Sequence, residues 1–178
     1  MATPDRKRWS KFNITSPWWE HHRGLLYTNE PFNDQVSLAE WRELGYTQTK
    51  FTGDMYDMRN TEPDWIAEFK KYFPWQHFSW SVYRMCPGTV LPNHSDTYAK
   101  FKELYNISNI HQIHRAVVFL EDWQSGHYFE IDDEPWTNWS AGDCVVWQSD
   151  VPHLAANVGK TNRYTLQITG VPYENPFV

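Results

Sequence analysis

The chain has 178 residues, a length that suits one well-buried core better than two domains. Hydrophobic residues make up 40% of it and aromatic residues 17%, so we expect a folded chain rather than a disordered one. The net charge of −6 and the lack of a long Lys or Arg run exclude the basic surface that nucleic acids and anionic membranes attract. We therefore predict a single domain over residues 1–178 with neither nucleic acid nor a membrane as a partner.

The sequence also bears on the compartment. No window approaches 18 consecutive apolar residues, and no apolar run follows the basic residues of MATPDRKRWSKFN, so we predict neither a membrane-spanning helix nor a signal peptide. The two cysteines, Cys86 and Cys144, are too few for a disulfide framework and lack a CxxC spacing. We expect two core thiols in a cytoplasmic protein.

Residues 1–77 contain two helix signals, and we expect them to form a mixed, partly helical support. Ser37 to Glu40 has the pattern of a capping box that opens a helix, and Gly45 would close that helix. A second helix is predicted from Thr61. Its apolar face would consist of Trp65, Ile66, Phe69 and Phe73. Both helices would pack against a sheet.

From about residue 78 the chain changes to short runs rich in Val, Ile, Tyr, Phe and Trp, separated by turn residues. The runs are FSWSVYRM, RAVVFLEDW, QSGHYFEI, GDCVVW and NRYTLQIT. Several short strands with no helical pattern between them favour an antiparallel sandwich or a small barrel. We therefore predict a mainly β core over residues 78–170 with flanking helices.

A candidate metal site begins just after a Pro-Gly turn. His94 and Asp96 are two residues apart, so on a strand both side chains point to the same face. His153 follows the predicted strand GDCVVW and could supply a second imidazole. Two histidines and one carboxylate form a triad that binds a divalent transition metal and leaves other coordination positions open. The His-x-Asp spacing alone is close to what chance supplies, so the surrounding pattern matters.

Arg163 stands ten residues beyond His153, within the predicted strand NRYTLQIT. Its guanidinium can bind a carboxylate through two hydrogen bonds, and Thr165 shares its face and can donate another. A metal with open positions beside such an arginine suits a ligand that chelates at one end and is anionic at the other.

The order His94-x-Asp96, His153 and Arg163 resembles the iron(II) and 2-oxoglutarate dependent dioxygenases. The context resembles that family too, in PGTVLPNHSD, AVVFLEDWQSGHYFEI and WSAGDCVVWQSDVPHLAANVGKTNRYTLQIT. The resemblance covers about residues 78–170 and implies a double-stranded β-helix, a jelly roll or cupin-like barrel. The pattern is similar both to the prolyl 4-hydroxylase branch and, through His114-Arg115 and the segment 139–153, to the aspartyl/asparaginyl β-hydroxylase branch.

The resemblance implies the cofactors and the reaction. His94, Asp96 and His153 would hold Fe(II) and be catalytic through it, while 2-oxoglutarate would chelate the metal and place its far carboxylate on Arg163. The enzyme would use O2, with ascorbate as a candidate reductant, and release succinate and CO2. It would hydroxylate an amino-acid or peptide side chain or a small molecule.

Three further residues are candidates for binding the cosubstrate. Thr165 would assist Arg163, although threonine is also simply a good strand former. Tyr83, on the strand before the turn, could donate to 2-oxoglutarate or be an ordinary core tyrosine. Arg115 opens an apolar strand, so it either points to solvent or binds a carboxylate inside the barrel.

Other histidines and one loop have a weaker claim on the site. We expect the segment Thr97 to Gln112 to be a polar loop that covers the substrate. The histidines that we do not expect to bind the metal are His21, His22, His111, His114 and His127.

Two other functions stay open. A cupin-like isomerase or binding protein would use the same barrel with Zn, Mn or Ni and no 2-oxoglutarate, but it would have no need of Arg163. A β-sandwich interaction module without catalysis would respond to neither metal nor 2-oxoglutarate.

Overall fold

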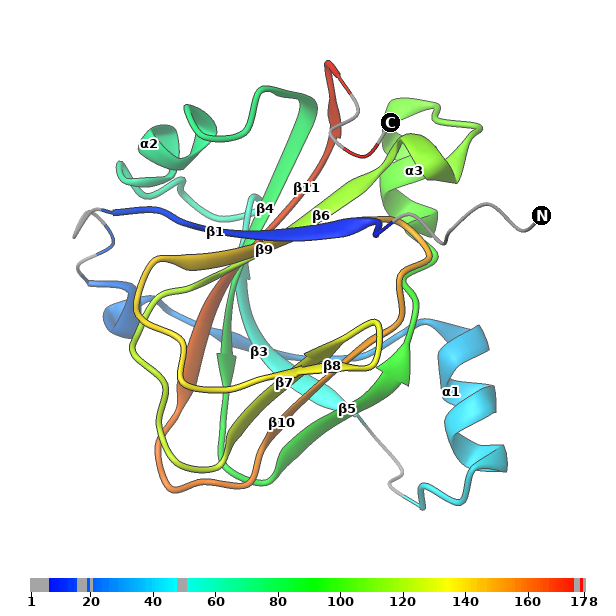
Figure 1. The fold of residues 1–178 in the computed structure, drawn as a ribbon, viewed down its shortest axis with the longest axis vertical. Coiled ribbons are helices and arrows are strands. Elements are labelled where there is room, and N and C mark those ends of the chain that lie inside the picture. The colour runs from blue at the N-terminus through cyan, green and yellow to red at the C-terminus, as the bar shows by residue number, and fades with distance from the viewer. Residues whose placement is uncertain (1–6, 16–18, 20, 48–50, 175–176, 178) are drawn as a thin grey trace.

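The computed structural model describes residues 7–15, 19, 21–47, 51–174 and 177. Within them, two antiparallel sheets face each other (Figure 1). The larger sheet has the strand order β1-β9-β6-β11-β4-β3-β2, and the smaller has the order β5-β10-β7-β8. The strands are β1 Trp9–Asn13, β2 Thr28–Pro31, β3 Thr52–Asp57, β4 Trp75–Met85, β5 Thr89–His94, β6 His114–Phe119, β7 His127–Ile131, β8 Glu134–Trp136, β9 Asp143–Gln148, β10 His153–Asn157 and β11 Arg163–Pro172.

The chain passes back and forth between the sheets from β4 onwards. Strands β4, β6, β9 and β11 lie in the larger sheet, and β5, β7, β8 and β10 lie in the smaller one. This arrangement of eight strands is a double-stranded β-helix, so the predicted fold class is confirmed.

The central strands of the larger sheet are buried on both faces. On β6, Val117 and Phe119 point into the barrel, whereas Ala116 and Val118 point to the outer face. A strand buried on both sides reads as a continuous apolar run rather than an alternating one, which explains the run RAVVFL.

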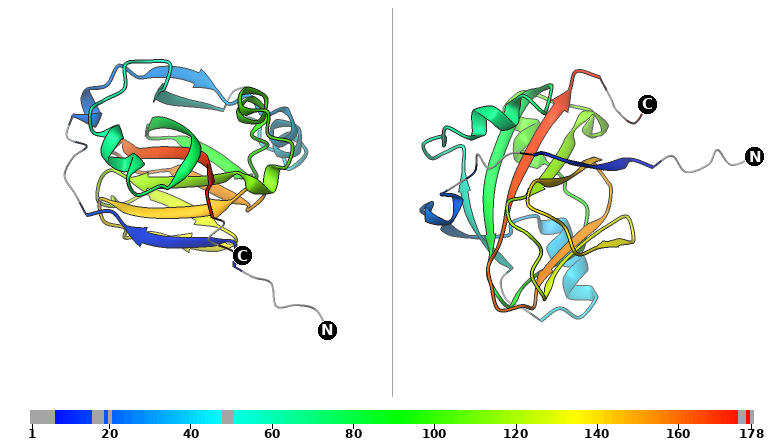
Figure 2. Two further views of the ribbon diagram at one scale, coloured as in Figure 1. Left: turned by 90° about the horizontal axis from the view of Figure 1, so that it is seen from above. Right: turned by 60° about the vertical axis from the view of Figure 1, so that its left-hand side comes forward.

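Helix α2 (Ile66–Lys70) covers the outer face of the larger sheet (Figures 1 and 2). The apolar face predicted for it is buried together with outward side chains of the sheet. The helix begins at Ile66, several residues after the predicted start at Thr61.

Helix α1 (Gln35–Glu43) differs from the prediction in its first residues. Asp34 is the N-cap, and its side chain accepts hydrogen bonds from the backbone of Val36 at 3.0 Å and of Ser37 at 3.1 Å. The predicted cap at Ser37 is wrong because Asp34 already binds those amides and Ser37 is buried within the first turn.

Three strands of the N-terminal segment were not predicted. Strand β1 pairs with β9, and β2 and β3 extend the other edge of the larger sheet beyond β4. Trp9 is the one buried residue of β1, and β2 has none. The two edge strands, β1 and β2, need little apolar surface, so they carry no alternating pattern.

The segment predicted as a polar loop over residues 97–112 contains the helix α3 (Ala99–Tyr105) and a 3-10 turn, Ile110–Gln112; the other such turn is His22–Gly24. The loop prediction is wrong because Phe101 is buried with Tyr98 and Ile113, and Tyr105 packs against them. That spacing makes one apolar face of a short helix.

The barrel has two different ends. At the site end, β5 ends at His94, β10 begins at His153, and helices α1 and α3 flank them (Figure 1). At the turn end lie the β4–β5 and β10–β11 turns. There Gly126, with φ +92°, faces Gly159 so closely that an added Cβ would lie 2.3 Å from its Cα atom.

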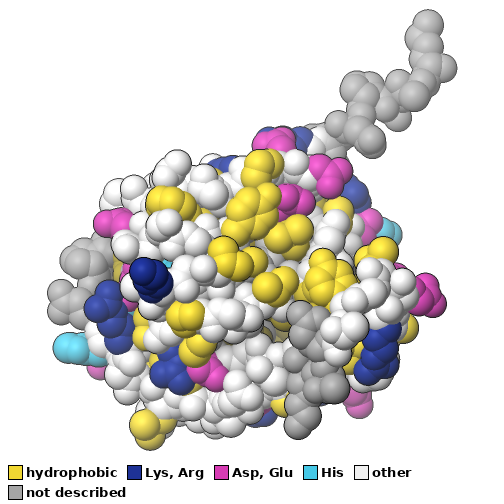
Figure 3. All heavy atoms as spheres, turned by 90° about the horizontal axis from the view of Figure 1, so that it is seen from below, with side chains coloured by type: hydrophobic (Ala, Val, Ile, Leu, Met, Phe, Trp, Pro, Cys, Tyr) yellow, Lys and Arg dark blue, Asp and Glu magenta, His cyan; other side chains and the backbone are white. Residues whose placement is uncertain are grey.

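Hydrophobic side chains gather on the side of the smaller sheet that faces away from the larger one (Figure 3). Tyr128, Leu154 and Ala156 alternate with inward residues of β7 and β10 and are half-buried. Both cysteines are free thiols; Cys144 is buried and Cys86 half-buried. None of the described helices is long and apolar enough to span a membrane.

Candidate metal centre

The structure brings His94, Asp96 and His153 together at the site end. One ligand atom from each lies within 4.8 Å of the others, and no other such group occurs among the described residues. The two histidines are register partners on β5 and β10, and Asp96 follows two residues after β5 ends. Pairing between strands therefore places side chains that are far apart in the sequence at one point.

Backbone carbonyls orient both imidazoles. Nδ1 of His94 donates to the carbonyl of Pro92 at 2.7 Å, and Nδ1 of His153 donates to that of Val151 at 3.1 Å. Because Nδ1 carries the proton in each ring, Nε2 is left with its lone pair. Nε2 of His153 lies 3.8 Å from Oδ2 of Asp96. This is the arrangement in which histidine binds a metal through Nε2 while a partner fixes its tautomer.

The protonation states also suit a metal. Burial and the nearby His94 lower the pKa of His153 to about 4, so its ring is neutral at neutral pH. Burial alone would raise the pKa of Asp96, but Arg115 and the two histidines outweigh it and lower the pKa to about 2. A metal thus meets a neutral imidazole and a carboxylate without having to displace protons from them.

Aromatic side chains from outside the barrel core support His94. The ring of Trp41, on α1, and the ring of Phe32 meet the imidazole edge-on, with centroids 5.4 Å and 5.3 Å away. Trp41 also donates through Nε1 to the carbonyl of Asn93 at 2.8 Å. Neither contact was foreseen, because nothing in the sequence pattern links α1 to a ligand more than fifty positions later.

Arg115 points into the barrel and reaches the triad. Its Nη2 lies 2.9 Å from Oδ2 of Asp96, and its Nη1 donates to Oε1 of Gln167 at 2.6 Å. The guanidinium also lies over the ring of Tyr98, 5.1 Å from the centroid. Gln167 was missed, although it follows Thr165 by two positions on β11 and so shares its face.

Arg163 is buried near the turn end of the same barrel interior. Its Nη1 donates to the carbonyl of Tyr128 at 2.7 Å, and its Nε has no hydrogen-bond partner among the residues that the structure describes. No described acidic side chain pairs with it, and burial lowers its pKa to about 10. Thr165 and Tyr83 are register partners two residues along their strands from Arg163 and its partner Met85. Burial raises the pKa of Tyr83, and the nearest charges that act on it are those of Arg115 and Asp96.

The separation of Arg163 from the triad follows from strand register. Tyr128 lies three residues along β7 from Ile131, which is the partner of His153 on β10. At about 3.3 Å per residue, the guanidinium therefore lies about 10 Å along the barrel from the level of the triad.

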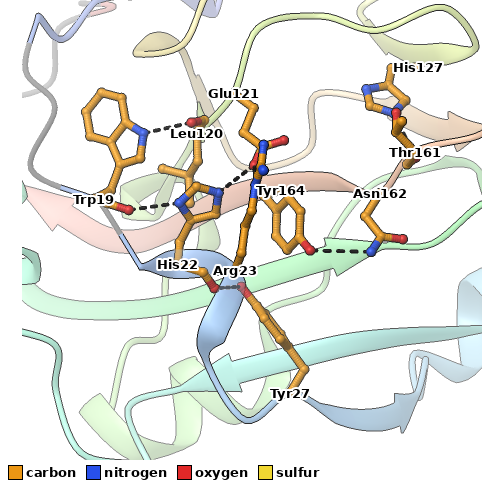
Figure 4. Close-up of polar contacts among 10 residues, drawn as sticks. All are labelled: Trp19, His22, Arg23, Tyr27, Leu120, Glu121, His127, Thr161, Asn162 and Tyr164. Carbon is orange, nitrogen blue, oxygen red and sulfur yellow. Dashed lines mark hydrogen bonds and ion pairs between the residues drawn. The ribbon is translucent and has the colours of Figure 1, made fainter.

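Other histidines are held elsewhere. His22 lies between the carbonyl of Trp19 and the carboxylate of Glu121, each 2.8 Å away (Figure 4). Nε2 of His127 contacts the carbonyl of Thr161 at 3.1 Å, at the turn end. His21, His111 and His114 also lie outside the triad, as predicted.

Comparison with known proteins adds information on the fold. No family model matches the chain, and no curated protein is significantly similar to it in sequence. A prolyl-4-hydroxylase structure from Pseudomonas putida is 16% identical, with a TM-score of 0.53 over 83% of this chain and 93% of that one. A predicted oxalate decarboxylase from Thermotoga maritima is 13% identical, with a TM-score of 0.42 over 67% of this chain and 81% of that one. KdgF from Halomonas is 11% identical, with a TM-score of 0.42 over 71% and 84%. At these identities the likenesses concern the fold alone, which the strand topology of the two sheets already shows to be a double-stranded β-helix.

Proposed function

We propose that the protein is an Fe(II) and 2-oxoglutarate dependent dioxygenase that hydroxylates an amino-acid or peptide side chain or a small molecule. The observation that carries the proposal is the combination of two features in one barrel interior: three side chains placed to bind a metal, and the buried guanidinium of Arg163 without an acidic partner among the described residues. The fold shared with a prolyl-4-hydroxylase structure is consistent with this chemistry.

His94, Asp96 and His153 would hold Fe(II), since a set of two imidazoles and one carboxylate suits that ion. When bound, iron(II) and 2-oxoglutarate supply the oxidising chemistry that uses O2 and yields succinate and CO2. The protein's own part is to orient the ligands and to keep water away. The indole of Trp147, with its centroid 4.8 Å from that of His153, forms part of the apolar wall beside the triad.

Arg163 fits the far carboxylate of 2-oxoglutarate in charge and in distance. A buried guanidinium without a counterion is costly, and a carboxylate would remove that cost. A five-carbon diacid that is chelated at one end and hydrogen-bonded at the other spans about 10 Å from metal to guanidinium. The distance estimated from register is similar. Thr165 and Tyr83, which line the same inner face, would donate further hydrogen bonds.

The test is anaerobic addition of Fe(II) and then 2-oxoglutarate to the metal-free protein, followed by absorption spectroscopy. A weak visible charge-transfer band is expected from the chelated 2-oxo acid, with weaker 2-oxoglutarate binding in Arg163→Met. His94→Ala and Asp96→Ala should abolish succinate release in air while circular dichroism shows the fold retained. His111→Ala, which alters an exposed histidine outside the triad, is the matched control.

The opposite result would favour the cupin-like alternative. The same three ligands suit Zn, Mn or Ni as well as iron, and metal content after purification does not identify the working ion. A protein that binds one of these metals tightly, gives no band with 2-oxoglutarate and retains its properties in Arg163→Met would not be a dioxygenase of this class.

A further inference from the structure

We propose that the primary substrate carries a carboxylate, and that Arg115 and Tyr98 bind it at the site end of the barrel. This inference rests on the proposed function, because it concerns what remains of the barrel interior once metal and cosubstrate are bound. Arg115 was predicted to bind the cosubstrate, but its contacts with Asp96 and Tyr98 favour a role in binding the substrate instead.

The two inward arginines are far apart along the barrel. Arg115 is the register partner of Thr169, six residues along β11 from Arg163. At about 3.3 Å per residue their backbones are about 20 Å apart. Arg115 contacts the ligand Asp96 directly, whereas the far carboxylate of a chelated 2-oxoglutarate must lie several ångströms from the metal. One cosubstrate molecule therefore uses Arg163 and leaves Arg115 for another group.

Two buried groups near Asp96 lack a well-formed hydrogen bond to a described residue. Nε of Arg115 has no partner, and the hydroxyl of Tyr98 makes no hydrogen bond of good geometry, although it interacts with Asp96 and Arg115 and affects the pKa of both. Buried polar groups are nearly always well satisfied in folded proteins, so two neighbouring exceptions mark a place where a ligand would supply the acceptor. A carboxylate has two oxygens and could accept from both.

The backbone conformation of Tyr98 also marks this place as a binding site. The residue has φ +51° and ψ +28°, in the left-handed region, and it directly precedes helix α3. A bulky aromatic residue is rarely found there, and such conformations concentrate at binding and catalytic sites. This conformation accompanies the burial of the Tyr98 ring under the guanidinium of Arg115.

A charge count points to an anion. Arg115 and Arg163 bring two positive charges into the barrel, and Asp96 is the one described carboxylate that pairs with either of them. Asp57 and Glu30, at the edge of the same sheet, share the exposed Arg59 and form a separate cluster. At the triad and the two inward arginines, the charges of Fe(II) and the 2-oxoglutarate dianion cancel, so one positive charge remains there. A substrate carboxylate at Arg115 would neutralise it, and burial favours neutral sets of charges.

The experiment measures binding to protein loaded with Mn(II) and 2-oxoglutarate, with Mn(II) in place of the reactive iron. Each of the proteinogenic L-amino acids and its carboxamide is added, and the melting temperature is recorded. The two members of a pair differ in the charge of the α-carboxyl group. We expect at least one acid to raise the melting temperature and to bind at least tenfold more tightly than its amide. The amides of Asp and Glu keep a side-chain carboxylate, so they show whether the bound group is an α-carboxylate or a side-chain one.

Variants of Tyr98 and Arg115 test whether these residues cause the preference for the acid over its carboxamide. Tyr98→Phe removes only the hydroxyl and should weaken binding of the acid about tenfold, as expected for a lost hydrogen bond to a charged group. Arg115→Lys keeps the charge but lacks Nε, and should also lose the preference. Tyr105→Phe, on the same helix, is the matched control and should bind the acid like the wild type. The melting temperature of each metal-free variant shows whether it folds.

The failures of the two proposals are distinguishable. If 2-oxoglutarate does not bind to the wild-type Mn(II) protein, the proposed function fails. If 2-oxoglutarate binds but no acid outperforms its carboxamide, or Tyr98→Phe keeps the full preference, the carboxylate proposal is overturned while the dioxygenase assignment stands.

Discussion

Replacement of Arg163 by methionine should make the metal-free protein more stable. Burial lowers the pKa of this guanidinium from 12.5 to about 10, a change that corresponds to a penalty of about 3 kcal/mol for the buried charge. The lost hydrogen bond to the carbonyl of Tyr128 offsets about 1.5 kcal/mol of this gain. The free energy of unfolding of Arg163→Met should therefore exceed that of the wild type by about 1 to 2 kcal/mol, the balance of these two contributions.

Urea denaturation in the presence of a chelator measures this difference. Arg84→Met is the matched control, because Arg84 pairs with Asp54 at 2.7 Å and its removal should not stabilise the protein. Addition of Mn(II) and 2-oxoglutarate should raise the stability of the wild type more than that of Arg163→Met. A metal-free Arg163→Met protein that is less stable than the wild type by more than about 1 kcal/mol would show that the buried charge is already compensated, and would refute the reasoning.

Three further outcomes are expected. The pKa of His153 falls from 6.5 to about 4 on folding, so between pH 6.5 and 4 the unfolded metal-free chain binds more protons than the folded one. The free energy of unfolding should therefore fall by about 3 kcal/mol as the pH drops from about 6.5 to 4. His153→Leu should remove most of that slope in urea titrations. Gly126→Ala should lower stability by at least about 2 kcal/mol, whereas Gly45→Ala, with the same φ of +92° and open space around it, should cost less, as thermal denaturation can show. Trp41→Phe should weaken Mn(II) binding severalfold in calorimetry by loosening His94; unchanged affinity would contradict a supporting role for the indole.

The elements that could be predicted are those whose burial requires a recognisable pattern of apolar residues. The central strands were found because both of their faces are buried. The spacing of two residues suggested His94 and Asp96 as a pair, and only the pattern of the surrounding segments joined His153 to them. Strand β2, with the sequence TNEP, has no buried residue and could not be recognised.

Contacts between distant elements explain what was missed at the site. The position of Tyr98 beside Arg115 and Asp96 accompanies a left-handed backbone conformation that its residue type would argue against. The contact between Arg115 and Asp96 depends on how β6 lies relative to the end of β5. Such features arise from packing in three dimensions, so no residue spacing or periodicity in the sequence predicts them.

The metal centre depends on residues that precede the segment containing its ligands, and the N-cap of α1 is one of them. One oxygen of Asp34 caps the helix, and the other accepts a hydrogen bond from Thr97, the residue after Asp96. A polypeptide trimmed to residues 78–170 would keep every ligand, yet it would lose this anchor and the rings of Phe32 and Trp41. Changes in a helix that contains no ligand could thus tune the metal site during evolution while the ligands themselves stay the same.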